Sequence, residues 1–218
     1  VSTPNVASSG VIFAVGTAPV QMVEGGKINE VVMANNYAEA VQKLGYSDDW
    51  KKYSLCEVIY TAFQLYTIAP IFLVNVLDPA KQKVQKTLNM EVMENQVKLP
   101  IEAIAESVKV NGLEKGTDYE AFYDDDNCIV EFLSDTTGEV ELEYYEVDPT
   151  QIDKEDIIGG FSVTTHKTTG LELIDSVFPR FTEIPDLIIC PGWSHDSEVA
   201  AVMSAKAENI NGLFEADV

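Results

Sequence analysis

The fold class is decided by residues 54–77, which read SLCEVIYTAFQLYTIAPIFLVNVL. Over residues 55–68 the apolar side chains recur at helical spacing, so this part predicts an amphipathic helix. Ser54 and Glu57 have the spacing of a capping box, in which each side chain satisfies a backbone N–H group of the other residue. Pro70 ends the helix, and the apolar run over residues 71–77 predicts a strand buried on both faces.

A second apolar run lies upstream, at residues 10–16, GVIFAVG. It predicts another buried strand, and the order strand, helix, strand predicts a parallel pair joined by a right-handed crossover. A shorter helix is predicted between the two strands, over residues 37–44. Asn36 is its expected N-cap, with Glu39 at the third helical position and Gly45 just past the end.

The same pattern returns from residue 157. Gly159-Gly160 predicts a turn, and the apolar spacing over residues 171–178 predicts a short helix that ends at Pro179. The apolar residues 187–190 predict a third buried strand.

The last predicted helix covers residues 197–210, with Ser194 or Asp196 as its cap and Asn211-Gly212 at its end. Residues 213–218, LFEADV, predict the start of a further strand.

Between these parts, residues 87–148 have an apolar period close to two. Along residues 139–144, apolar residues alternate with glutamates, which is typical of a strand with one wet face. Residues 119–123 and 128–133 flank the sequence DDDN and predict a hairpin, and residues 108–110 precede a turn at Asn111-Gly112.

The charge changes with the pattern. Residues 87–148 carry 17 acidic and 3 basic side chains, which leaves 14 of the 22 net negative charges in this segment. We therefore predict an α/β fold in which helices flank a mixed or mostly parallel sheet. Residues 1–86 and 149–218 would form this discontinuous core domain, and residues 87–148 an inserted acidic β-rich domain of barrel or sandwich type.

The net charge of −22 disfavours two classes of partner. Phosphate backbones and anionic membrane surfaces both repel such a surface, so we expect neither nucleic acid nor a membrane as a partner. No stretch reaches the roughly 20 apolar residues of a membrane span, and residues 1–5 lack the basic region of a signal peptide. The soluble compartment of a cell is expected.

Several short motifs contain residue types used in catalysis or metal binding. Ser194-His195-Asp196 has the residue types of a hydrolase triad, but consecutive residues at a helix start point in different directions, so helix capping is expected. His166 is the only other histidine and is expected in an exposed loop. Residues 124–127 lack the ligand spacing of a calcium loop, so a solvated turn is expected, with a weak surface calcium site as the alternative.

Two further features are also expected to be structural. Residues 16–19, GTAP, follow a strand as a phosphate loop does, but lack both glycine-rich nucleotide fingerprints, so the glycine of this turn is expected to serve backbone conformation. Cys56, Cys128 and Cys190 contain no C-x-x-C pair, and we expect reduced, buried packing residues. We predict no catalytic, cofactor-binding or metal-binding residue, and no cofactor.

The last third of the chain has a distinctive order of motifs. Residues 170–179 read GLELIDSVFP, and residues 184–194 read IPDLIICPGWS. VAAV follows at 199–202 and KAENING at 206–212. In this order they resemble the phage tail sheath family, in which a GLeLId-VFP helix, a P-LI-aPGwS strand and turn, and a VaA…KAe-Ing-F helix follow one another.

Two earlier segments extend this resemblance over most of the chain. Residues 11–19, VIFAVGTAP, look like an early family strand, and residues 156–160, DIIGG, resemble the junction after the β-rich insert. Each piece is weak by itself, but the combined pattern is specific.

The resemblance implies a structural subunit of a contractile sheath, and not an enzyme. Many copies would form hexameric rings or a helical sheath around a tail tube protein, and contract on a baseplate trigger to drive the tube through a cell envelope. The expected location is the virion tail, or a phage-tail-like particle, assembled in the cytoplasm of a bacterial host. The α/β part would lie nearer the tube, and the acidic insert would project outward.

Relative to the family pattern, the chain begins close to its first strand and ends within a late one. We therefore expect both arms that link sheath subunits to be absent, and expect that the chain does not polymerise by itself. Two other classes of protein stay open. One is an α/β enzyme with a ligand beyond the carboxyl ends of its strands, and the other is an acidic adhesion or receptor-binding module.

Overall fold

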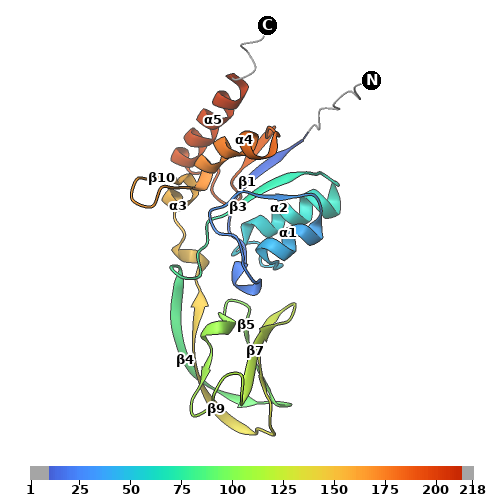
Figure 1. Ribbon diagram of the computed structural model, residues 1–218, viewed down its shortest axis with the longest axis vertical. Helices are drawn as coiled ribbons and strands as arrows, with labels where there is room; N and C mark the ends of the chain where they lie inside the picture. Colours follow the sequence, from blue (N-terminus) through green and yellow to red (C-terminus); the bar gives the residue numbers. More distant parts are fainter. Residues whose placement is uncertain (1–9, 213–218) are drawn as a thin grey trace.

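A four-stranded sheet forms the centre of the larger part of the molecule. The computed structural model describes residues 10–212 (Figure 1), so the strand predicted at 213–218 lies outside the described residues. The strand order is β12 (Leu187–Ile189), β1 (Ile12–Gly16), β3 (Ile71–Asn75) and β2 (Val32–Ala34).

The sheet is mixed and mostly parallel. β1 pairs in parallel with both β12 and β3, which confirms the predicted parallel pair. β2, which was not predicted, adds antiparallel to β3 at the other edge. The prediction of a mixed or mostly parallel sheet with helices is therefore confirmed.

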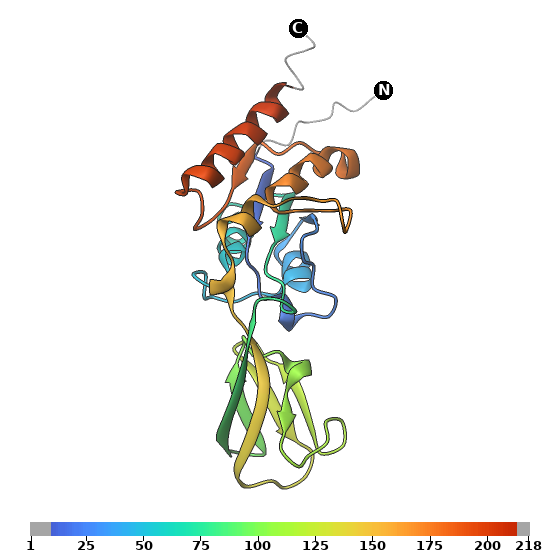
Figure 2. The same cartoon turned by 90° about the vertical axis from the view of Figure 1, so that its left-hand side faces the viewer.

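Helices cover both faces of this sheet (Figures 1 and 2). On one face, Ala14 and Leu73 pack in a core with α1 (Tyr37–Leu44) and α2 (Ser54–Tyr60). On the other face, Phe13 and Phe72 pack with a second group of elements. These elements are the 3₁₀ helix η5 (Gly170–Ser176), α4 (Val177–Phe181) and α5 (Ser197–Gly212).

The ends of α1 are as predicted. The Asn36 side chain accepts a hydrogen bond from the Glu39 backbone N–H at 2.9 Å, and Gly45 follows the last helical residue with a φ of 75°. At Gly45 a Cβ atom would lie 2.4 Å from the Pro19 carbonyl oxygen, so both the conformation and the space require glycine.

The capping box predicted for α2 is wrong. The Thr17 Oγ1 atom, at the end of β1, accepts the Ser54 N–H at 3.1 Å, and the Thr17 carbonyl accepts the Leu55 N–H at 3.0 Å. The Ser54 hydroxyl instead accepts the Thr17 N–H at 3.3 Å. A residue 37 positions away therefore caps the helix, and local spacing could not reveal it.

The predicted helix 55–68 also differs in length and type. The α-helix ends at Tyr60, and one π-helical turn, η2 (Thr61–Leu65), follows it. The helix predicted at 171–178 is a 3₁₀ helix followed by α4, and Pro179 lies within α4 instead of ending it. Proline is tolerated in the first turn of a helix because the N–H that it lacks would have no intrahelical partner there.

The third core strand is less buried than predicted. β12 lies at the edge of the sheet, and 49% of the Leu187 surface is exposed. Cys190, immediately after the strand, is buried. The apolar run 187–190 therefore predicted the burial of Cys190 correctly, but not the exposure of Leu187 at the edge of the sheet.

The inserted region consists of two antiparallel sheets around one hydrophobic core. In the first sheet, β9 (Gly138–Val147) pairs with β4 (Lys83–Val92) and β6 (Lys109–Val110). In the second, β8 (Asn127–Phe132) pairs with β5 (Gln96–Pro100) and β7 (Tyr119–Tyr123). The predicted hairpin and the predicted alternation are confirmed, since Leu142 and Tyr144 are buried while the glutamates between positions 139 and 143 are exposed.

Short elements join the two parts. β4 begins at Lys83, upstream of the predicted change at residue 87, and runs beside β9 out of the core (Figure 1). Lys52 forms an ion pair with Glu102 at 2.8 Å at the base of the insert. The remaining short elements are η1 (Val20–Met22), η3 (Ala105–Ser107), η4 (Pro149–Gln151), α3 (Lys154–Ile158), β10 (Gly160–Ser162) and β11 (Lys167–Thr169).

Candidate interaction surface

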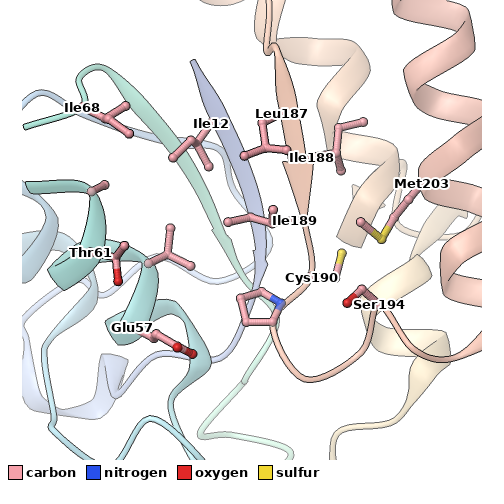
Figure 3. A pocket seen from close by; sticks show the side chains of 13 residues that line it. Ile12, Glu57, Thr61, Ile68, Leu187, Ile188, Ile189, Cys190, Ser194 and Met203 are labelled. Carbon is pink, nitrogen blue, oxygen red and sulfur yellow. The ribbon is translucent and has the colours of Figure 1, made fainter. Parts of the chain in front are cut away.

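An apolar groove of about 580 Å³ lies beside the edge strand β12 (Figure 3). Its floor is formed by Ile12 of β1 with Leu187 and Ile189 of β12, and α2 forms one wall. Met203 of α5 and Ser194 line its other end. Figure 3 shows Leu187 and Ile189 pointing toward α2, whereas Ile188 points toward Met203.

The groove is open because α2 does not extend over β12. In the centre of the sheet, α2 covers β1 and β3, and every residue of both strands is buried. On β12, one strand further out, Leu187 is exposed and Ile188 and Ile189 are partly buried. The outer edge of β12 also has no strand partner among residues 10–212. An open edge of this kind is able to accept another chain.

The groove walls are nearly free of charge. Residues 58–77 contain no charged side chain, and residues 187–195 contain no acidic one. Glu57 is the charged residue in the lining. Burial raises the pKa of the Cys190 thiol to about 12, so this cysteine is protonated and is a poor nucleophile at neutral pH. The chemistry of the groove therefore suits apolar contact.

A second hollow of about 580 Å³ lies beyond the carboxyl ends of β1 and β12, where open α/β sheets bind ligands. It is lined by Thr17, Lys52, Ser54 and two tryptophans, among others. Thr17 caps α2, the Ser54 hydroxyl accepts the Thr17 N–H, and Lys52 is paired with Glu102. These three polar groups thus join structural elements, and Lys51 and Glu57 are further charged residues of the lining.

The glycine of the GTAP sequence has a packing role. A Cβ atom at Gly16 would lie 2.4 Å from the Ser54 hydroxyl oxygen, so the close approach of α2 to the end of β1 requires glycine. The expectation that this glycine serves backbone conformation is wrong, because Gly16 does not have a positive φ, and the close approach of Ser54 explains it instead.

The Ser194-His195-Asp196 sequence caps α5. The Asp196 Oδ1 atom accepts the Glu198 N–H at 2.9 Å and the Val199 N–H at 3.2 Å. These bonds, the Val199 bond first, lower the pKa of Asp196. Ser194 and His195 are exposed. Of the two predicted caps, Asp196 is the one that the structure uses.

The other motif residues also have structural positions. Asp124 Oδ1 accepts the Asp126 and Asn127 N–H groups, which lower its pKa and close the turn between β7 and β8. His166 is exposed in the turn between β10 and β11. Within residues 10–212, no group of three or more His, Cys, Asp or Glu side chains is arranged to hold a metal ion.

All three cysteines are free and buried, as predicted. No helix in the described part of the chain combines the length and apolarity that a bilayer span requires.

The segments that carry the sheath resemblance meet in one ion cluster. Lys206 of α5 is 8% exposed, and its Nζ atom lies 2.7 Å from both Glu172 and Asp175 of η5. Burial opposes the charge of Lys206, but the bonds to Asp175 and Glu172 outweigh this effect and raise its pKa. The GLELID and KAE sequences are therefore joined in space.

No known protein family matches this chain, and no curated protein matches it significantly.

The groove was not predicted, because residues 187–190 were expected to form a fully buried strand. The available signal was the absence of acidic residues in 58–77 and 187–195 of a strongly acidic chain.

Proposed function

We propose that this protein is a structural subunit of the contractile tail sheath of a bacteriophage or a phage-tail-like particle. Copies of it would surround a tail tube and contract to drive the tube through a cell envelope. The observation that carries the proposal is the ordered set of sequence motifs at residues 11–19, 156–160 and within 170–212, which resemble the sheath family and follow one another in its order.

The packing of these motifs supports the proposal. Residues 170–179 form η5 and the start of α4, residues 187–189 form β12, and residues 197–212 form α5. The first and last of these, η5 with α4 and α5, cover the Phe13 and Phe72 face of the sheet, and β12 extends the sheet at its edge. Lys206 joins α5 to η5. A subunit that transmits force needs rigid packing of this kind more than it needs a reaction centre.

The distribution of charge also supports assembly. The insert carries 14 of the 22 net negative charges, whereas the β12 groove has nearly uncharged walls. Like charges oppose contact between copies, so copies would meet through the core and hold their inserts apart.

The decisive experiment is co-expression of the protein with a candidate tail tube protein from a neighbouring gene, followed by electron microscopy. We expect rings or helical tubes built around a central tube. Assembled tail particles that lack this protein, or a protein that stays monomeric in the presence of its tube protein, would contradict the proposal. An adhesion module would give no tubes and would bind cell surfaces instead.

If the protein were an α/β enzyme, the hollow beyond the carboxyl ends of β1 and β12 would be the expected ligand site, and ligand binding there can be tested. Thermal unfolding of the protein would be followed with common nucleotides and divalent metals. We expect shifts below about 1 °C for a sheath subunit, because Thr17, Ser54 and Lys52 already have partners. A specific shift of several degrees would favour the enzyme.

A further inference from the structure

A projecting hairpin exposes two apolar side chains. In the described part of the chain, β10 and β11 pair with each other and with no other strand, and they extend away from the core (Figures 1 and 2). Phe161 on β10 is 61% exposed, and Val163, just past the strand, is 77% exposed. An isolated two-stranded hairpin has little stability of its own, so exposed apolar residues on it are costly unless a partner covers them.

The hairpin also differs in charge from the rest of the chain. Residues 157–171 contain no acidic side chain, but they include Lys167 and His166. In a chain with a net charge of −22, this hairpin is a place where another copy can approach without charge repulsion.

The β12 groove has complementary properties. It is apolar, lies next to a sheet edge that has no strand partner among residues 10–212, and has Glu57 as the charged residue in its lining. In Figure 2 the hairpin extends to the right of the core, whereas α2 and α5, which bound the groove, lie to the left. The two surfaces therefore cannot meet within one molecule.

We propose that the β10–β11 hairpin of one copy docks in the β12 groove of the next copy. Phe161 and Val163 would pack against Leu187 and Ile189, and Lys167 would face Glu57. This inference rests on the proposed function, for which it supplies a specific contact between subunits. Two different surfaces on opposite sides give a head-to-tail contact, which builds rings or open helices and not closed pairs.

The contact is expected to be weak for a single pair. A hairpin tip in a groove buries less than the roughly 1,200 Å² of a stable interface. The sequence alone led us to expect that the chain does not polymerise by itself; this contact instead predicts weak association of the isolated chain, which should appear only at high concentration. In a sheath, the same contact is repeated by every copy, and its effect multiplies.

The test uses two variants with opposite defects. Phe161→Ser with Val163→Ser removes the apolar tip of the hairpin, and Leu187→Glu places a charge in the groove. Leu133→Ser is the matched control, because Leu133 is 54% exposed but lies in the insert. Circular dichroism and thermal unfolding would first show that all variants are folded.

Sedimentation velocity over a concentration series then distinguishes the outcomes. We expect the wild type and Leu133→Ser to form oligomers of increasing size, and each of the other two variants to stay monomeric. A mixture of those two variants should form a one-to-one dimer and nothing larger, because one intact hairpin and one intact groove remain. Variants that associate like the wild type, or a wild type that stays monomeric, would overturn the inference.

A photo-crosslinker at position 161 identifies what occupies the groove. In a mixture of heavy-isotope and normal chains, we expect crosslinks to residues 187–189 between different copies. Crosslinks confined within single chains would show that the chain covers its own groove and would refute the contact. If tubes form around the tail tube with both variants, the contact is wrong but the proposed function stands; if no tubes form even with wild-type protein, the function itself fails.

Discussion

The α/β core and the acidic insert bury their sheets differently: the core buries both faces of its central strands, and the insert buries only one face of β9. In the core, helices cover both faces, and all residues of β1 and β3 are buried. In the insert, β9 has one buried face, with Leu142 and Tyr144, and one exposed face of glutamates. A strand covered on both faces has no position for a charge, so the acidic residues collect where sheets have a wet face.

This difference places the charged surface and the nearly uncharged surface on separate parts of the molecule. The insert carries most of the negative charge, and its exposed faces would repel other negatively charged surfaces. The core leaves β12 and its groove nearly uncharged at one edge. Under the proposed function, the core would make contacts and the insert would keep assemblies apart in solution.

The largest expected effect comes from a cavity in the doubly covered sheet. Phe72 of β3 is fully buried, and its ring centroid lies 5.3 Å from that of Phe181. Phe72→Ala should lower the free energy of unfolding by about 3–5 kcal/mol in a denaturant titration. Phe178→Ala is the control, since Phe178 is 54% exposed, and should change it by less than about 0.5 kcal/mol.

The same variant tests whether the insert unfolds separately. Cys56 and Cys190 lie in the core and Cys128 lies in the insert, and all three are buried. A thiol reagent should therefore label each one only after local unfolding. Phe72→Ala should accelerate the labelling of Cys56 and Cys190 more than that of Cys128. Equal acceleration at all three would show that the two parts unfold together.

A smaller loss is expected where the core packs most closely. In Gly16→Ala, the new Cβ atom would lie 2.4 Å from the Ser54 hydroxyl oxygen, so either this hydroxyl rotates away and loses the hydrogen bond from the Thr17 N–H, or the start of α2 shifts. We expect about 1–3 kcal/mol of destabilisation, measured by thermal unfolding. Gly160→Ala is the matched control, because its Cβ atom would meet nothing within 4 Å. A Gly16 variant as stable as this control would contradict the packing role.

In the insert, a charge reversal should stabilise the fold. Glu91 and Glu139 lie directly opposite each other on β4 and β9, and both are exposed. Glu139→Lys replaces a cross-strand repulsion by an attraction, which should be worth about 0.5 kcal/mol at low salt and less at high salt. Glu139→Gln removes only the repulsion and should give an intermediate value. A gain that does not depend on salt would exclude this electrostatic explanation.

The smallest effect concerns the pH dependence at the start of α5. Hydrogen bonds from the Val199 and Glu198 N–H groups lower the pKa of Asp196 below its unfolded value. Its contribution to stability is therefore present above the unfolded pKa and is lost as the pH falls through the lowered pKa of the folded state. Asp196→Asn keeps an acceptor but does not titrate, so the variant should be slightly less stable at pH 7 and match the wild type in acid. A difference that stays constant with pH would contradict the charged cap.

Local patterns predicted the parts of this protein whose causes are local. Asn36, Glu39 and Gly45 mark the ends of α1 because a helix cap depends on residues within one turn. The alternation around Leu142 predicted β9 because a strand with one wet face carries its burial pattern in its own sequence. The hairpin around the DDDN sequence was predictable for the same reason.

The errors occurred where a distant segment decides the outcome. Ser54 looked like the cap of its own helix, but Thr17 fills that role from the end of β1. β2 was missed because a three-residue strand takes its stability from pairing with β3 and not from its own pattern.

The sequence by itself determined the α/β class, the acidic β-rich insert and the buried strands β1 and β3, because periodicity and charge are properties of neighbouring residues. Only the tertiary structure decided that β12 lies at an open edge, that α2 stops short of it, and that the Phe161 hairpin extends on the opposite side. The burial of an apolar run depends on what the rest of the chain places over it. A one-dimensional pattern does not contain that information.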